Sequence, residues 1–228
     1  MVEYCRETSS LRSENMTSFN GFEQRDFDIF LIDGLEERMH ELRTHISPKL
    51  EAIAQAIQPT AASMTGDEMF VHVAKHARRT KNPPNDTWSA LANSKRGYKQ
   101  LPHFQFGMWH THVFIWFAII YESPIKVQFA EELERHKNHI LKTIPDDFVW
   151  SKDHMQPETI SHEAMKNGEF DAVVNRLKTV KKAEILCGVT IDRHDDRLKD
   201  GQKFMTYCEE TIKKLSLFYN LTKKIGQA

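Results

Sequence analysis

The chain has 228 residues, of which 40% are hydrophobic and 28% are charged, and its formal net charge is -1. This composition is ordinary for a globular domain that buries a core without metals or disulfides, and it excludes a polycation that binds nucleic acid through overall charge. The longest apolar run, Val113 to Tyr121, is too short to span a membrane, and the polar N-terminus lacks the apolar stretch of a secretory signal. We therefore expect a cytoplasmic protein with no membrane partner.

The number and spacing of the cysteines also indicate a cytoplasmic protein. Cys5, Cys187 and Cys208 are odd in number and widely spaced, so no pair has metal-ligand or redox spacing. We expect Cys187 and Cys208 to be small buried thiols, as in a protein of a reducing compartment.

The N-terminal residues differ from the rest of the chain. Residues 1–15 lack apolar periodicity and are predicted to be a disordered tail, with Met16 as a candidate for the true start. Residues 16–228 contain no internal repeat and no linker, so they are predicted to form a single domain.

A long helix is predicted from Gly34 onward. Apolar residues recur there at intervals of three and four, which places them on one helical stripe: Leu35, Met39, Leu42, Ile46, Leu50, Ile53 and Ile57. The stripe keeps its phase across Pro48, so we favour a kink at the proline over a restart capped by Ser47.

Strands are predicted in the middle of the chain. Residues 69–79 fit a strand or a helix, and we favour a strand; residues 88–93 predict another, followed by a turn at 94–97. Phe104, Phe106 and Met108 alternate with His103, Gln105 and Gly107, which predicts a half-buried strand. The run from Val113 to Tyr121 is apolar at almost every position and predicts a central strand.

The C-terminal half alternates between helices and short strands. Ser123 and Pro124 predict the start of a helix that runs to Pro145, and 148–151 predict a short strand. A short helix around 170–177, a strand over 185–191 and a last helix over 204–221 follow. The predicted class is α+β, with a mostly antiparallel central sheet flanked by long N- and C-terminal helices.

Several blocks of the chain resemble the YktB-like family of bacterial proteins. They include GDEMFVHVAKHARRTKNPPNDTW, ANSKRGYKQLPHFQFGMW, THVFIWFAIIYESPIK, IPDDFVWSKDH and TVKKAEILCG. The resemblance covers about residues 19–225, and residues 156–168 look less regular, like a surface loop. It implies a bacterial cytosolic α+β domain, and because the family carries no established activity it transfers no catalytic residues.

The segment from Val71 to His103 is basic. It holds seven basic residues and only Asp86 as an acid, and it is interleaved with aromatic residues such as Trp88. Arginine forks, an anion nest at Gly97 and stacking rings are features of phosphate recognition. The candidate anion-binding residues are Lys75, Arg78, Arg79, Lys95, Arg96, Tyr98, Lys99 and His103. A solvated positive face balanced by acidic helices is the commoner meaning of such a run, and that interpretation stays open.

Other groups of polar residues are weaker candidates for a functional site. His72 and His76, and also His110 and His112, have shared-face spacing, but no HExxH motif or cysteine partner accompanies them, so we predict no metal site and no cofactor. One interpretation of residues 151–154 is an acid–base pair of Asp153 and His154 with Ser151 nearby. The favoured interpretation is a loop in which the aspartate caps a turn. Phosphate-binding and dinucleotide glycine motifs are absent.

These observations leave three functional hypotheses. The first is a binding module for a phosphate-bearing ligand, either a nucleotide or a nucleic acid, through residues 71–103. The second is an enzyme on a small anionic substrate, with His103 or His76 as acid–base group beside the arginines. The third is a protein-interaction or structural role, for which exposed apolar surface would be the sign.

Overall fold

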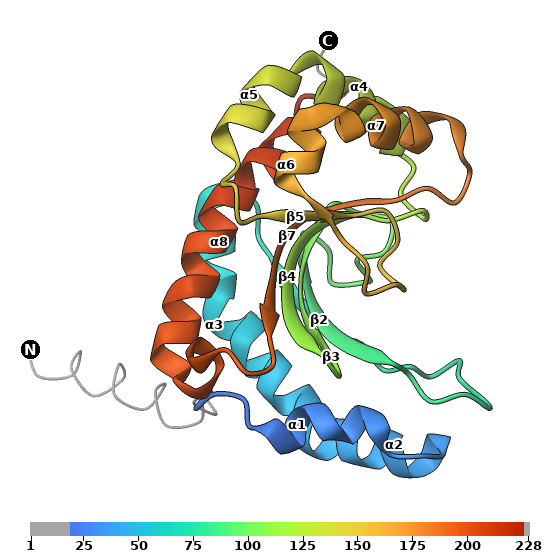
Figure 1. Cartoon of the computed structure of the whole chain (residues 1–228), viewed down its shortest axis with the longest axis vertical. Coiled ribbons are helices and arrows are strands. Elements are labelled where there is room, and N and C mark those ends of the chain that lie inside the picture. Colours follow the sequence, from blue (N-terminus) through green and yellow to red (C-terminus); the bar gives the residue numbers. More distant parts are fainter. Residues whose placement is uncertain (1–18, 226–228) are drawn as a thin grey trace, which may run out of the picture.

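A seven-stranded sheet organises the computed structural model, which describes residues 19–225 (Figure 1). The strand order is β1-β2-β3-β4-β7-β5-β6, and each neighbouring pair is antiparallel. The strands are β1 Phe70–Val73, β2 Asp86–Ala92, β3 His103–Trp109, β4 His112–Ile119, β5 Val149–Ser151, β6 Ile160–Ser161 and β7 Ile185–Asp192. The predicted α+β class and antiparallel sheet are confirmed, whereas the predicted tail over 1–15, the start at Met16 and Cys5 lie outside the described residues.

Helices occupy one face of the sheet and both of its ends. They are α1 Gln24–Asp28, α2 Leu35–Glu41, α3 Ser47–Thr65, α4 Lys126–Arg135, α5 Lys137–Thr143, α6 His162–Ala164, α7 Phe170–Thr179 and α8 Gly201–Thr222. Short 3-10 turns lie at Ile29–Leu31 and Asp196–Lys199, and π-helical turns at Leu42–Ile46 and Met165–Glu169. Figure 1 shows α4 to α7 gathered at one end of the molecule and α1 with α2 at the other.

The main core lies between the sheet and the two long helices, α3 and α8. The predicted stripe of α3 is buried there, with Leu50, Ile53 and Ile57 at 0% exposure. The Ser89 hydroxyl of β2 donates to the Leu50 carbonyl at 2.8 Å, which ties α3 to the sheet. Cys187 and Cys208 are buried free thiols in this core, as predicted.

The long N-terminal helix passes Pro48 without a break. Helical backbone continues from Leu35 to Thr65 through the π-helical turn at Leu42–Ile46, just before Pro48. Pro48 lies in the first turn of α3, where its missing N–H is tolerated. The helical backbone therefore does not restart at Ser47, and its irregularity is a π-turn that comes before the proline, where we predicted a kink at Pro48 itself.

Three local predictions need correction. The helix expected from Ser123 begins at Lys126, because Ser123 N–H bonds to the Ile120 carbonyl in a turn, and non-helical His136 divides it into α4 and α5. Every residue of β3 is buried, although a half-buried strand was predicted. Residues 156–168 are only partly a surface loop, because β6 and α6 lie within them and His162 is 0% exposed.

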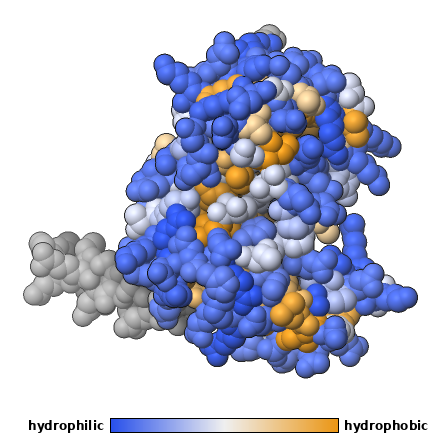
Figure 2. Space-filling view, viewed as in Figure 1, coloured by the Kyte–Doolittle hydropathy of each residue, from blue (hydrophilic) through white to orange (hydrophobic). Residues whose placement is uncertain are grey.

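The surface of the described residues is mostly polar. Figure 2 shows hydrophilic side chains over most of the visible face, with apolar ones in small areas between them. Across residues 19–225, no helix has both the length and the apolar character needed to cross a bilayer.

Candidate functional site

The second face of the sheet is concave and carries a layer of aromatic side chains. Alternation along the strands turns these residues away from α3 and α8, and Figure 1 shows the sheet curving around this side. Trp88, Trp109, Phe114 and Trp116 form the layer, together with smaller apolar residues, and each is at most 9% exposed. This second layer is why β3 is buried on both faces.

Two glycines let the aromatic rings lie against the strands. Gly107 stands opposite Phe114, and Gly188 stands opposite Trp116. A Cβ on Gly107 would lie 2.3 Å from Cζ of Phe114, and one on Gly188 would lie 1.9 Å from the Ile115 carbonyl oxygen. No side chain fits at either position, so the close ring-on-backbone packing depends on glycine.

An isolated carboxyl group lies on this concave face. Asp86 opens β2 opposite Trp109 and is 1% exposed. Neither of its carboxyl oxygens is hydrogen-bonded by another residue among those described. Burial raises the pKa of Asp86 to about 7, against the opposing charges of His154 and Arg79. An unpaired buried carboxylate is costly, so near neutral pH this group exists in both protonation states.

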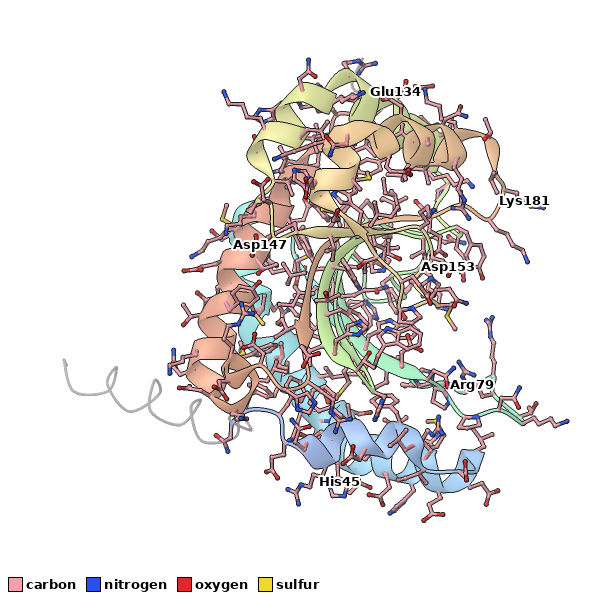
Figure 3. The ribbon with its side chains drawn as sticks, in the orientation of Figure 1. His45, Arg79, Glu134, Asp147, Asp153 and Lys181 are labelled. Carbon is pink, nitrogen blue, oxygen red and sulfur yellow. The ribbon has the colours of Figure 1, made fainter. Side chains whose placement is uncertain are left out.

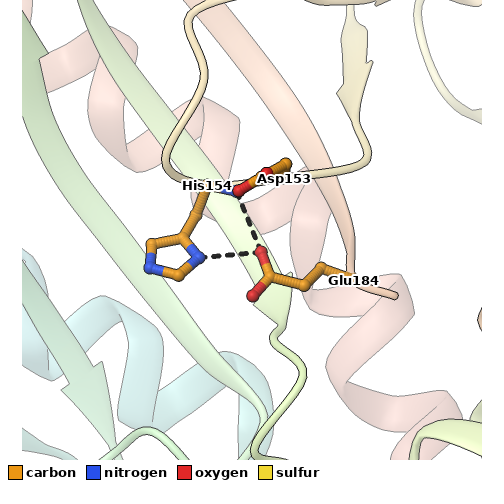
Figure 4. Close-up of side chains that lie close together, drawn as sticks. All are labelled: Asp153, His154 and Glu184. Carbon is orange, nitrogen blue, oxygen red and sulfur yellow. Dashed lines mark hydrogen bonds and ion pairs between the residues drawn. The ribbon is translucent and has the colours of Figure 1, made fainter. Parts of the chain in front are cut away.

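A second carboxylate, that of Glu184, holds the side chain of His154, as Figure 4 shows. The charge of His154 also acts on the Asp86 carboxyl. His154 Nδ1 donates to Glu184 Oε2 at 2.7 Å, and the His154 backbone N–H donates to the same oxygen at 2.9 Å. Glu184 Oε1 accepts the Tyr121 N–H. The Nε2 of His154 points away from Glu184 and has no hydrogen-bond partner within residues 19–225.

The pKa of His154 reflects two opposing influences. Burial alone would lower it, but the hydrogen bond and charge of Glu184, together with the charges of Asp86 and Asp153, raise the pKa above its ordinary value. Burial raises the pKa of Glu184, and its bonds from His154 and Tyr121 reverse that and lower it. Glu184 is therefore a carboxylate that stabilises a protonated imidazole and fixes its orientation.

Asp153 completes a cluster of three groups with metal-ligand chemistry. A carboxylate oxygen of Asp153, a ring nitrogen of His154 and a carboxylate oxygen of Glu184 lie within 4.8 Å of one another. Asp153 Oδ1 accepts the Met155 N–H at 2.9 Å, which confirms the predicted turn-capping loop. The atoms of Glu184 and His154 that could ligate a metal are already hydrogen-bonded to each other. The cluster is therefore a hydrogen-bonded pair and not an open site for a cation.

Trp88 links the polar groups of this face. Its ring makes edge contacts with His76 and His154, at centroid distances of 5.6 and 5.9 Å. Its Nε1 donates to the Tyr98 hydroxyl at 2.9 Å. Burial, followed by the charge of Arg79, lowers the pKa of His76 to about 4, and its Nε2 lies 3.0 Å from Thr87 Oγ1.

Four of the predicted anion-binding residues line a single groove. Lys75 follows β1, while Arg96, Tyr98 and Lys99 belong to the segment between β2 and β3. The groove, called here the basic groove, has a volume of about 1060 Å³ and is also lined by His72, Gly97, Glu51 and Glu122. Lys99 lies 3.7 Å from Glu122, so one cation of the groove already has an acidic neighbour.

The other predicted residues lie outside the basic groove. Lys95 stacks over the Phe70 ring at 5.2 Å, and Arg79 donates to the Asn82 and Pro83 carbonyls. Arg78 is exposed in the 74–85 segment. His103 is 0% exposed, with Nδ1 on the Leu101 carbonyl and Nε2 beside the Gln105 amide, and burial lowers its pKa to about 4.

The sequence pointed to some of this site and missed the rest. Figure 3 shows Arg79 and Asp153 on the concave side of the sheet, although 74 positions separate them in the chain. Asp86 was visible as the lone acid of a basic segment, but its burial was not. Glu184 carried no local signal, because it meets His154 only where β7 inserts beside β5.

Comparison with known proteins places these residues in a family context. Residues 22–219 match the domain family described as a domain of unknown function, DUF1054. A UPF0637 protein of Bacillus velezensis is 49% identical over 205 residues, which cover 90% of this chain and 98% of that protein. UPF0637 proteins of Bacillus licheniformis and Bacillus cytotoxicus are each 45% identical, over 90% and 89% of this chain and 97% and 98% of their own lengths.

Proposed function

Since this chain belongs to the DUF1054 family, as its resemblance to YktB-like proteins predicted, and the description of that family names no activity, we propose its function from its own site: the basic groove binds a small phosphate-bearing ligand. The observation that carries the proposal is the convergence of Lys75, Arg96 and Lys99 on one groove from two separate segments. Lysine ammonium and arginine guanidinium groups are the usual partners of phosphate oxygens.

The charge balance of the groove favours a small ligand over nucleic acid. Glu51 and Glu122 line it together with the three basic residues, so its net positive charge is small. A long polyanion needs a row of cations along its backbone. A single phosphate group, by contrast, needs only a few donors, and the exposed Lys99 can exchange its half-buried Glu122 neighbour for it at little cost.

The volume and the walls of the groove also suit a small molecule. Its volume of about 1060 Å³ lies at the upper end of the range for small-molecule sites, roughly 300–1,000 Å³. The Tyr98 ring is held by the Trp88 hydrogen bond and lies 5.5 Å from the His72 ring. Burial raises the pKa of Tyr98 to about 12, so its hydroxyl stays neutral and can donate to a ligand.

The proposal is tested by thermal shift and calorimetry with inorganic phosphate, pyrophosphate and AMP. A ligand at about 100 times its dissociation constant should stabilise the fold by about 2.7 kcal/mol. We expect the double variant R96Q/K99Q to weaken binding by about tenfold or more, because two cationic donors are lost. The matched control is K142Q/K213Q, which removes two exposed lysines on α5 and α8 and should bind like the wild type.

Two outcomes would count against this function. The first is the absence of any stabilisation by all three probes. The second is equal weakening by the groove variant and the control, which would mean non-specific attraction. Binding of a single-stranded oligonucleotide that is tighter than AMP and falls steeply with salt would replace the small ligand by a nucleic acid.

A further inference from the structure

We propose that Asp86 and His154 form an acid–base pair on the concave face that hydrolyses a phosphate ester. The inference rests on the proposed function for its ligand class, because the basic groove supplies the phosphate recognition. It adds an activity and two catalytic residues outside that groove. Tyr98 belongs to the lining of the groove and accepts a hydrogen bond from Trp88 of the concave face, so this contact joins the two places.

The first support is the orientation of His154. Glu184 accepts the hydrogen bond of Nδ1–H, which leaves Nε2 directed away from it with no partner in the described chain. A carboxylate that fixes one imidazole nitrogen so that the other is available is the arrangement a general base needs. The Glu184 bonds to the His154 backbone and to Tyr121 hold the pair in place.

The second support is independent and comes from Asp86. Its carboxyl is 1% exposed and lacks a partner on any other residue in the described ranges. A fold does not normally leave such a group unsatisfied, and an unpaired buried acid near a histidine is typical of functional sites. Asp86 shares the face of Trp88, whose ring contacts His154.

The proposed step is balanced by the pair and one water molecule. His154 Nε2 takes a proton from the water as its oxygen forms a bond to phosphorus. The bond between phosphorus and the ester oxygen breaks, and that oxygen takes the proton of the Asp86 carboxyl. The products are an alcohol and a phosphate, and the proton on His154 passes through solvent back to Asp86.

The pair is closed in this conformation. The side chain of His154 is 8% exposed and Asp86 is 1% exposed, which excludes bulk water and strengthens electrostatic interactions. Residues 155–159 follow His154 directly and are all exposed. We infer that displacement of this segment admits the ester, as a loop that gates a site.

The charged groups around the pair set its pH dependence. Asp86 faces His154 from the 152–159 segment, Arg79 from the 74–85 segment and Tyr98 from the 94–102 segment. His154 faces Glu184, Asp86 and Asp153, with His103 on β3 also within electrostatic range. A base that must be neutral and an acid that must be protonated predict a bell-shaped rate profile, whose limbs report the raised pKa of His154 and the pKa of Asp86 near 7.

The test combines activity with binding. Hydrolysis of p-nitrophenyl phosphate and of bis(p-nitrophenyl) phosphate is followed from pH 5 to 8, and pyrophosphate binding is measured by calorimetry. We expect H154Q and D86N each to lower the hydrolysis rate by about 100-fold or more while pyrophosphate binding is retained. E184Q, a positioning variant, should shift the pH profile to lower pH. The controls are H139Q and D147N, which alter exposed groups away from the pair.

The outcomes separate the two proposals. If pyrophosphate binds but the wild type hydrolyses neither ester at any pH, the acid–base pair is overturned and the binding function stands. If hydrolysis persists in folded H154Q and D86N, the assignment of the two residues is also overturned. If neither phosphate, pyrophosphate nor AMP binds, the proposed function itself fails. Circular dichroism of each variant separates a lost fold from a lost proton donor or acceptor.

Discussion

The indole Nε1 of Trp88 donates a 2.9 Å hydrogen bond to the Tyr98 hydroxyl, which joins the aromatic layer of the concave face to the basic groove. Trp88 is 6% exposed, so its N–H has little access to water. Tyr98 lies in the segment between β2 and β3 and brings Gly97 and Lys99 with it into the groove. The positions of the residues that line the groove should therefore depend on this hydrogen bond.

Removal of that hydroxyl gives the first prediction. In Y98F the buried Trp88 N–H loses its acceptor, and we expect the free energy of unfolding to fall by about 1–3 kcal/mol. Urea unfolding followed by tryptophan fluorescence measures the change. The control is Y121F, because Tyr121 is 44% exposed and a surface substitution should change stability by less than about 0.5 kcal/mol. Equal free energies of unfolding for Y98F and the wild type would show that a water molecule replaces the phenol hydroxyl as the acceptor of the Trp88 N–H.

Much of the fold could be predicted because its signals are local. The stripe of α3 and the alternation along β7 follow from a few neighbouring residues, and each indicates which side is buried. The full burial of β3 was missed because its second cover consists of Trp88, Phe114 and Trp116 from other strands. No property of the β3 sequence alone reveals that cover.

The site shows the same division between local and distant signals. Arg96 and Lys99 are close in the chain and line the same groove, so a local cluster of basic residues is enough to single them out. The position of Lys95 outside that groove could not be predicted, since the Phe70 ring that it contacts belongs to β1. The pairing of His154 with Glu184 depends on a strand order in which the last strand enters between β4 and β5.

A second prediction concerns pH and Asp86. Burial raises the pKa of Asp86 from 3.8 to about 7, so between these values the folded protein holds a proton that the unfolded chain has released. Stability from this group is complete below pH 3.8 and is lost as the pH rises through 7. We expect D86N to gain stability relative to the wild type across that window, on the order of 4 kcal/mol for a shift of about three pH units.

Urea unfolding of both proteins at intervals from pH 4 to 8 measures this difference. Burial lowers the pKa of His76, His103 and His112 to about 4, which makes stability rise with pH in both proteins, so their contributions largely cancel in the comparison. A difference between D86N and the wild type that stays constant with pH would mean that Asp86 is charged and paired in solution. D147N, at an exposed position, is the control.

A third prediction concerns the carboxylate behind His154. In E184Q the charge and the carboxylate acceptor of the 2.7 Å bond are lost, so the pKa of His154 should fall below its value in the wild type. Because the folded-state pKa of His154 is raised, the stability it contributes is present below its unfolded value and is lost as the pH rises through the folded value. The disadvantage of E184Q should therefore be largest on the acid side of neutrality.

Proton-detected imidazole NMR resolves this pKa directly. The fall in E184Q should be accompanied by loss of the preference for the Nδ1–H tautomer in the neutral form. H139Q serves as the assignment control, since it removes an exposed histidine from the spectrum without touching the pair. An unchanged His154 pKa in folded E184Q would refute the role given to Glu184.

A fourth prediction concerns the two glycines beneath the aromatic layer. A methyl group on Gly188 would lie 1.9 Å from the backbone oxygen of Ile115, whereas on Gly107 its nearest atom is the tip of the Phe114 ring. Backbone cannot move as a side chain can, so we expect G188A to lose more than about 3 kcal/mol of unfolding free energy or to fail to fold.

The contrast between the two sites gives the control. F114L removes the ring tip and should recover part of the stability lost in G107A, although the Thr87 carbonyl remains 2.6 Å from the new methyl group. The same F114L change should recover none of the loss in G188A. A double-mutant cycle on thermal or urea unfolding measures both couplings. If F114L restored stability to G188A, β4 and β7 would have to shift together to admit the new methyl group. The contact of rings with the backbone would then not set the spacing of β4 and β7.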